Sequence, residues 1–595
     1  MKYFIYVVIF SIFLIQLHAS QIGNASIYAP AVLTGENKGT LTIFQLNVTT
    51  GNGTVSITGP SSVGASTLNS AEAAVAYACS YLGLNKSSYN FYYTIYDKNV
   101  SVSGPSGGLA FTLDAISALS HVPLLHNFTL TGVIEPNGSV GEIGGIYDKV
   151  SAAKQHNLSF ILAPYAANGS FENFIYYIAQ QAFNIPIVEV KNVSQALQLA
   201  TGRELPSWLN YSISNDYHTG MLPYANLNCS ECNLTDFQNL TSFTFNFTNN
   251  TIKGISNRYY AAKSSFEKDM SKYAMIAQKG YLYTAADFSY LLFAQAFVLE
   301  HSNETSNASA SQLISQISSY CSSLQPPQLT NSNYEYVIGG ELRQEFGNIT
   351  INNAAEMLNQ STTSDEVFDS IYTAGEAYGW CLAAQDMYNI AASINGTPVS
   401  SSKLKAYAYK LVNNASAYGS SLYSQSALYF YNNGNYPSSI YSAIYARIFN
   451  NPVIPNYNAS QYLSIESSLI NSSRYGIWPN QFAKSSEFYI SEYNITKNIS
   501  DLQTAYSLAL LASNLSAANK LINNSFVYLN ESQPNYLQSQ QFVQLSTEIQ
   551  QIYAILFVIT IILFVIMVLL IINTVRPPCL KAENKIKSKR KDLRR

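Results

Sequence analysis

Residues 104–108 read GPSGG and run directly into the apolar stretch LAFTLDAISAL of residues 109–119. A serine between glycines at the start of an apolar helix has two interpretations. In the first, Gly-Pro-Ser is turn chemistry and the helix simply begins there. In the second, Ser106 is a nucleophile. A serine hydroxyl is a poor nucleophile unless a neighbouring base accepts its proton, so the choice depends on finding that base.

The residues around the serine suit the second interpretation. Gly104 is expected to be the N-cap and Pro105 the first helical residue, which places Ser106 in the first turn. Gly107 and Gly108 leave the backbone amides of this turn uncovered. These amides and the helix dipole favour an anion, and the tetrahedral intermediate of acyl transfer is an anion. Gly104 and Gly107 are therefore predicted to support the site.

One candidate base is a histidine. The pattern G-x-S-x-G matches the nucleophile elbow of α/β-hydrolases, in which an acid and a histidine follow the serine. That elbow needs an apolar strand before the serine, whereas residues 98–103 read KNVSVS. The histidines available to such a triad stand in no recognisable motif; they are His121, His126, His156, His218 and His301.

The other candidate base is a lysine. Residues 143–157, IGGIYDKVSAAKQHN, predict a helix whose apolar stripe includes Ile146 and Val150. Lys149 lies on the border of this stripe, where loss of water would lower its pKa toward that of a useful base. Alternatively, Lys149 is a surface residue that buries only its alkyl stem and keeps its amine in water.

The two segments together resemble a known family. GPSGGLAFTLDAISAL, followed by TLTGVIEPNGSVGEIGGIYDKVSAAKQHNLSFILAP, closely resembles the proteolytic domain of the Lon family over residues 38–203. The resemblance implies that Ser106 is the nucleophile and that the neutral amine of Lys149 is the general base, without a histidine. The 43 residues between them are the separation that this family shows. Thr131 is implied to hold the lysine amine by a hydrogen bond.

The sequence departs from the family pattern in three ways. Ser103 stands where most Lon enzymes have aspartate, and GPSAG has become GPSGG. T-G-E-I has become T-G-V-I with Glu135 two residues later, so a carboxylate near the lysine is expected to be missing or displaced. The chain has no Gly-Lys dipeptide and hence no G-x-x-x-x-G-K-[ST] loop for ATP. The closer resemblance is to the ATP-independent, membrane-linked archaeal group, whose implied substrates are unfolded proteins or peptides, and Lon-like domains commonly form rings of identical subunits.

The ends of the chain predict a membrane protein. Residues 1–20 are typical of a secretory signal peptide, with an uncleaved anchor as the alternative. Residues 552–572 are apolar and long enough to cross a hydrocarbon core of roughly 30 Å. The tail, residues 573–595, carries a net charge of +7 and is therefore expected in the cytoplasm, with the N-terminal bulk outside the cell membrane.

The predicted exterior part has the composition of an exported glycoprotein. It carries a net charge of −11, which argues against a nucleic-acid partner. The 29 N-x-S/T sites lie between Asn24 and Asn530, and the tail has none. No H-E-x-x-H motif or clustered His/Asp set is present, so neither a metal nor another cofactor is predicted.

The six cysteines are too few for a disulfide framework in a chain of 595 residues. Cys229 and Cys232 form a C-x-x-C, for which a local disulfide is favoured over zinc because no second pair of ligands follows. Cys321 and Cys381 are a second candidate pair. Cys79 lies on an apolar helical pattern and is expected in the core.

The fold class predicted is an α+β Lon-type domain over residues 21–203, then an all-α region over residues 204–550 and the membrane helix. The α/β pattern begins at about residue 38. The expected strands are 40–48, 54–59, 90–97, 127–136, 158–164 and 185–190, and the expected helices are 71–84, 105–120, 143–157, 173–183 and 194–201.

Long helical patterns fill the second region, and residues 431–450 look like a helix–turn–helix that hints at a repeat array. Two functions remain open for the whole chain. One is a membrane-anchored, outward-facing, ATP-independent serine endopeptidase. The other is a non-catalytic glycosylated envelope scaffold or binding protein that retains a Lon-like fold.

Overall fold

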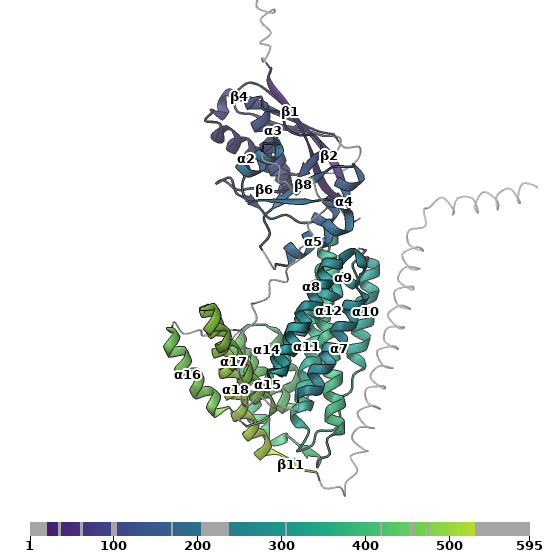
Figure 1. The fold of residues 1–595 in the computed structure, drawn as a ribbon, viewed down its shortest axis with the longest axis vertical. Helices are drawn as coiled ribbons and strands as arrows, with labels where there is room; N and C mark the ends of the chain where they lie inside the picture. The colour runs from purple at the N-terminus through teal and green to yellow at the C-terminus, as the bar shows by residue number, and fades with distance from the viewer. Residues whose placement is uncertain are drawn as a thin grey trace, which may run out of the picture. The chain divides into compact units, whose positions relative to one another are not determined.

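The fold is described from a computed structural model (Figure 1). The described residues are 21–33, 37–59, 63–96, 104–167, 170–203, 237–303, 306–416, 419–450, 457–473 and 475–529. The predicted signal peptide, membrane helix and basic tail lie outside them, as does the Cys229 and Cys232 pair.

The first sheet has four strands in the order β1-β2-β4-β3. They are β1 (Gln21–Leu33), β2 (Lys38–Thr50), β3 (Val55–Thr58) and β4 (Tyr89–Tyr96). β2 is antiparallel to both β1 and β4, and β3 is parallel to β4. Along β2, Phe44, Leu46 and Val48 alternate with exposed residues, which is the pattern of a strand with one face on the core.

The strand β1 extends the domain before residue 38, where the predicted α/β pattern starts. It pairs with β2 from Leu33 opposite Lys38 to Gly23 opposite Val48. A proline inside a strand argues against a central position, and Pro30 is tolerated because β1 is at the edge of the sheet. Gly23 and Pro30 interrupt the alternation of apolar and polar residues by which a strand is recognised in a sequence.

The second sheet is parallel, in the order β5-β8-β9, and it is buried. Its strands are β5 (Phe128–Leu130), β8 (Phe160–Pro164) and β9 (Ile187–Val190). The single strand predicted at residues 127–136 is wrong. The chain leaves the sheet at Gly132 and forms β6 (Val133–Ile134), which pairs with β7 (Val140–Gly141).

Helices pack on both sheets, and the most buried of them carries the serine turn at its start. They are α2 (Ala65–Tyr81), α3 (Gly108–Ser120), α4 (Ile146–Gln155), α5 (Phe171–Phe183) and α6 (Val193–Ala200). α3 contacts β1, β2 and α2, so almost every side chain along it is buried. Its apolar residues belong to the hydrophobic core that α3 shares with β2, β4 and α2.

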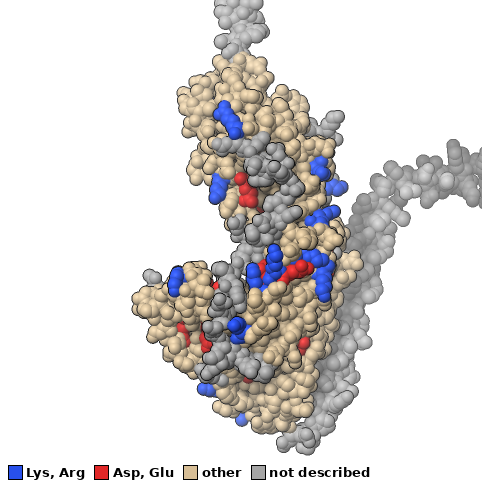
Figure 2. All heavy atoms as spheres, viewed as in Figure 1, with Lys and Arg blue, Asp and Glu red and all other residues tan. Residues whose placement is uncertain are grey.

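The described residues of the second region are helical, as predicted, apart from one pair of two-residue strands, β10 (Val399–Ser400) and β11 (Val527–Tyr528). Its helices are α7 (Gln238–Gly254), α8 (Tyr260–Gln278), α9 (Leu282–Glu300), α10 (Asn307–Ser323), α11 (Tyr334–Gln360), α12 (Ser364–Ser393), α13 (Lys405–Ser416), α14 (Leu422–Asn432), α15 (Tyr436–Phe449), α16 (Ala459–Ser472), α17 (Ile477–Thr496) and α18 (Ile499–Ser525). Charged side chains are sparse on the face drawn in Figure 2, in keeping with a charged fraction of 11%.

The helix–turn–helix predicted at residues 431–450 is present. α14 and α15 pack together, and the turn between them contains Gly434 with φ of 75°. The side chain of Asn435 accepts a hydrogen bond from the amide of Ser438 and so caps α15. A repeat array beyond this helix pair stays a prediction.

A disulfide joins Cys321 on α10 to Cys381 on α12, which confirms that pairing. Cys79 is free and buried, as predicted. One helix of the described residues, α9, is long and apolar enough to cross a membrane. Because 72% of its most apolar window is buried inside the protein, we treat α9 as a core helix.

Candidate functional site

Ser106 lies in a single 3-10 turn, residues 105–107, that leads into α3. Gly104 precedes it as the N-cap with φ of 124°, a conformation that L side chains rarely adopt. α2 holds this turn, because the Gly104 amide donates to Ser66 Oγ (3.0 Å) and Ser70 Oγ donates to the Pro105 carbonyl (3.0 Å). The turn is thus fixed from outside its own helix.

Thr131 and Gly132, which follow β5, also form hydrogen bonds with the serine turn. The amide of Gly132 donates to the Ser106 carbonyl over 2.8 Å, and the Gly132 carbonyl accepts from the amide of Leu109 over 3.0 Å. Thr131 Oγ1 also donates to the Ser106 carbonyl, over 3.3 Å. The amide and the carbonyl of Gly132 both bond to residues of the serine turn and α3, so they are not available for pairing with a neighbouring strand. The predicted strand 127–136 is interrupted at Gly132 for this reason.

Lys149 on α4 is buried, with 3% of its surface exposed. Its Nζ donates to Thr131 Oγ1 over 3.1 Å, which is the contact that the resemblance implies. The interpretation that Lys149 keeps its amine in water is therefore wrong. Thr131 joins the lysine amine to the main chain of Ser106 through two consecutive hydrogen bonds.

The direction of these bonds matters for a base. Thr131 Oγ1 gives its one proton to the Ser106 carbonyl, so it accepts a proton from Lys149 Nζ. A neutral amine held through one N–H keeps its lone pair for another proton. Within the described part of the chain, Ser106 Oγ and Lys149 Nζ form no direct hydrogen bond. Catalytic contacts of this kind often tighten only when substrate is bound.

Burial lowers the pKa of Lys149 to about 8, because the charged ammonium loses its hydration. The negative charges of Asp365 and Asp148 oppose this change and keep the pKa from falling further. A pKa near 8 leaves a substantial neutral fraction of the amine at mildly alkaline pH. That fraction is what a general base requires.

Asp365 comes from α12 of the helical region, yet it caps the helix that carries the lysine. Its Oδ2 accepts from the amide of Ile146 (2.6 Å) and its Oδ1 from the amide of Tyr147 (2.9 Å). The N-cap of α4 is Gly145, which has no side chain to do this. The carboxylate thus satisfies two amides at the positive end of α4.

Asp148 of α4 in turn accepts hydrogen bonds at the start of α12. Its Oδ2 accepts from the amide of Ser364 (2.8 Å) and its Oδ1 from the hydroxyl of Ser364 (2.6 Å). Each of the two helices therefore supplies an aspartate to the N-terminus of the other. We call this arrangement the reciprocal cap, meaning the four hydrogen bonds of Asp148 and Asp365.

Sequence reasoning missed both aspartates. Glu135, the displaced carboxylate of the family pattern, is exposed, and Asp148 and Asp365 act on the charge of Lys149 instead. The run TTSDE, with Thr363 and Glu366 forming a capping box, signals the start of α12. Nothing in the sequence indicates that the N-terminus of α12 contacts the N-terminus of α4.

The histidine alternative gains no support from the described residues. His121, His126 and His156 are exposed, and His121 follows the opposite end of α3 from Ser106. His218 lies outside the described residues. Within the described ranges, no group of three His, Cys, Asp or Glu side chains is placed to hold a metal ion.

This α/β region with its serine turn and buried lysine belongs to a known class of domain. Residues 18–202 match the family model of the Lon protease (S16) C-terminal proteolytic domain. The chain therefore contains a region, residues 18–202, that matches the Lon proteolytic domain, and a helical region follows it.

Individual Lon proteases are similar to part of this chain. Lon protease 2 of Herpetosiphon aurantiacus is 28% identical over 178 residues, which cover 29% of this chain and 21% of that protein. The archaeal Lon protease of Methanocaldococcus jannaschii is 32% identical over 115 residues, covering 19% and 16%. Lon protease 2 of Bacillus subtilis is 29% identical over 116 residues, covering 20% of each chain. The chain spans about a fifth of the length of these relatives.

Proposed function

We propose that this chain is a membrane-anchored, outward-facing, ATP-independent serine endopeptidase that uses Ser106 as nucleophile and Lys149 as general base. One observation carries the proposal. A buried lysine with a lowered pKa donates to Thr131, which donates to the carbonyl of Ser106, inside a domain of the Lon proteolytic type.

The proposed reaction needs only these groups. The neutral amine of Lys149 accepts the proton of Ser106 Oγ while Oγ attacks the peptide carbonyl. The tetrahedral oxyanion is stabilised at the start of α3, where the helix dipole is positive. The lysine then gives its proton to the leaving amine. It next accepts a proton from the water that attacks the acyl-enzyme and gives it to Ser106 Oγ as the acyl–oxygen bond breaks, which restores both the serine and the neutral amine.

The remaining parts of the proposal rest on the sequence. The missing Gly-Lys dipeptide supports independence from ATP, so the substrates are unfolded proteins or peptides at the cell envelope. The apolar residues 552–572 and the basic tail 573–595 support a single membrane pass with the bulk of the chain outside. Assembly into a ring is proposed from the resemblance to Lon.

The test is hydrolysis of casein or an unfolded peptide by the full-length protein in detergent, without ATP. The parent is compared with Ser106→Ala, Lys149→Ala and Lys154→Ala, since Lys154 is an exposed lysine of the same helix. We expect activity in the parent and the Lys154 variant and its loss in the other two.

Two results would end the assignment: an inactive parent between pH 6 and 10, or activity that survives the change at Ser106. The inactive parent would favour the non-catalytic scaffold, with binding by the helical region as its function. Activity without the Ser106 hydroxyl would mean that another group is the nucleophile. A Ser106 variant that fails to fold is recognised by circular dichroism and is then replaced by Ser106→Cys, which keeps the side-chain volume nearly unchanged.

A further inference from the structure

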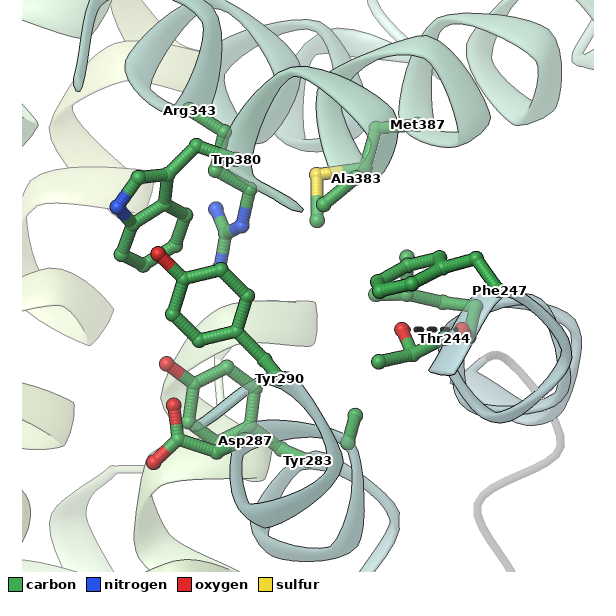
Figure 3. Close-up of a pocket in the computed structure, with 11 residues that line it drawn as sticks. Thr244, Phe247, Tyr283, Asp287, Tyr290, Arg343, Trp380, Ala383 and Met387 are labelled. Carbon is green, nitrogen blue, oxygen red and sulfur yellow. Dashed lines mark hydrogen bonds between the residues drawn. The ribbon is translucent and has the colours of Figure 1, made fainter. Parts of the chain in front are cut away.

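The helical region contains a cavity of about 440 Å³, within the size range of small-molecule sites. It lies among α9, α11 and α12 on one side and α14, α15, α17 and α18 on the other. A smaller pocket that shares Tyr283, Asp287, Tyr290, Arg343 and Trp380 adjoins it, and Figure 3 shows the side chains around that pocket. The proteolytic mechanism uses none of these residues.

Aromatic side chains with polar tips form much of the wall. They are Tyr283, Tyr290, Trp380, Tyr423, Tyr445 and Tyr489. Tyr445 is 9% exposed, and its hydroxyl makes no hydrogen bond to any described residue. The Tyr445 hydroxyl lines the cavity and can form a hydrogen bond with a ligand there.

Two carboxylates also line the cavity, Asp287 from α9 and Glu376 from α12. Among the described residues neither carboxylate has a hydrogen-bond or ion-pair partner. Burial raises the pKa of Asp287 to about 6 and the pKa of Glu376 to about 7, so both groups are mostly ionised at pH 8. Ionised groups in such a place are stabilised by a cation.

Among the described residues that line the cavity, Arg343 is the one that carries a positive charge. Arg343 is 6% exposed, its guanidinium stacks on the ring of Trp478 at 4.3 Å, and its Nη1 donates to the Gly339 carbonyl over 3.0 Å. It lowers the pKa of Asp287 without forming an ion pair with it. Two carboxylates against one guanidinium leave the lining with a net charge of −1.

We propose that this cavity binds the ammonium or guanidinium group of a lysine or arginine side chain carried by a polypeptide. Tyrosine and tryptophan faces attract cations, and carboxylates among them supply the opposite charge. The proposed binding depends only on the residues of the cavity, so it does not require that the protein is a protease. In a protease it would draw basic unfolded segments to the helical region.

The test measures binding apart from cleavage. The full-length Ser106→Ala protein, with Trp208→Phe to leave Trp380 and Trp478 as the fluorescent residues, is titrated at pH 8. The probes are acetyl-GGKGG-amide and the same peptide with glutamine in place of lysine. We expect the lysine peptide to quench fluorescence and to bind roughly tenfold more tightly than the glutamine peptide.

Variants locate the site. Asp287→Asn is expected to weaken binding of the lysine peptide roughly tenfold and Tyr445→Phe about threefold. Glu356→Gln, which removes an exposed carboxylate of α11 outside the lining, should leave binding unchanged. Equal binding of the two peptides overturns the proposal without any variant. Tighter binding of free spermidine than of the lysine peptide overturns the assignment to a polypeptide.

Discussion

Lys149 shows how one residue is set up for chemistry by its surroundings. Burial removes the hydration of its ammonium, and the single acceptor Thr131 fixes the direction of one N–H. The two aspartates keep its pKa near 8 and within a useful range. A lysine on the surface would keep its ordinary charge and serve no proton transfer.

Activity should rise with pH through the pKa of this lysine. In the proposed mechanism the neutral amine of Lys149 is the base, and this form predominates only above pH 8 because the pKa of Lys149 is about 8. A plot of kcat against pH should therefore increase with an apparent midpoint close to 8. Lys149→Arg is expected to be inactive at every pH, since arginine stays charged, whereas the exposed Lys154→Arg should match the parent.

Thr131 should matter through its hydroxyl and not through its shape. Thr131→Val keeps the volume but removes the acceptor of Lys149 and a donor to the Ser106 carbonyl. Loss of a hydrogen bond to a charged group costs about 1.5 to 3 kcal/mol, so kcat should fall roughly 10- to 100-fold. Thr131→Ser should restore most of the rate; a serine variant as slow as the valine variant would contradict the role.

The sequence could predict these residues because they are close along the chain. Ser106, Thr131 and Lys149 occur in order within one short motif, and the structure connects them. Asp365 could not be predicted, since it lies 219 residues after the amide that it caps. A contact of that range leaves no periodicity or spacing to read.

At the scale of elements, the reciprocal cap is what joins the two regions beside the site. α4 begins at a glycine with φ of 71° that offers no cap, and α12 brings the missing acceptor. The ring of Tyr147 also packs edge-on against Phe368, with centroids 5.0 Å apart. The helix that carries the base is therefore oriented by residues outside the proteolytic domain.

Changes at Asp365 should alter the pH dependence as well as the rate. Its charge raises the pKa of Lys149, so Asp365→Asn should move the rise in kcat to a pH below 8. Asp365→Ala removes both bonds to α4, which costs about 1 kcal/mol of cap energy and lowers kcat further. Asp369→Asn, one turn further along α12, is the matched control.

A purely structural role for Asp365 is distinguishable by the same measurement. It would lower the amount of folded enzyme and leave the midpoint of the pH profile where it was. Scaling the rates by active-site titration removes that effect.

Helices and strands could be predicted where the apolar residues recur with a single helical or strand period. α3, α4 and β2 have clear apolar stripes and appear where expected. β1 could not be predicted, because Gly23 and Pro30 interrupt its alternation. The break between β5 and β6 could not be predicted either, because it depends on hydrogen bonds between Gly132 and the serine turn, which is distant in the sequence.

At the scale of the molecule, one apolar core extends from the proteolytic domain into the helical region. It includes Ile146 and Val150 of α4 together with Phe297, Phe368 and Ile371 of the second region. Shared burial of this kind couples the stability of the parts. Heating should therefore unfold the proteolytic domain and α12 in a common transition.

The disulfide should contribute measurably to that stability. Cys321 and Cys381 close a loop of 60 residues, for which the chain-entropy model gives about 4 kcal/mol. Replacing both by alanine should lower the melting temperature measured by circular dichroism. Dithiothreitol should lower it in the parent and leave the double variant unaffected; a drop in both would assign the effect elsewhere.

The reciprocal cap also imposes an order in time. A ribosome that has just added Ile146, the first residue of α4, must add a further 219 residues to reach Asp365, which takes roughly 10 to 45 s at ordinary elongation rates. Until then the chain has the residues of the Ser106 turn, but α4 lacks its Asp365 cap. The nascent chain therefore carries the proposed site in its less stable, uncapped form while its own unfolded segments are still emerging.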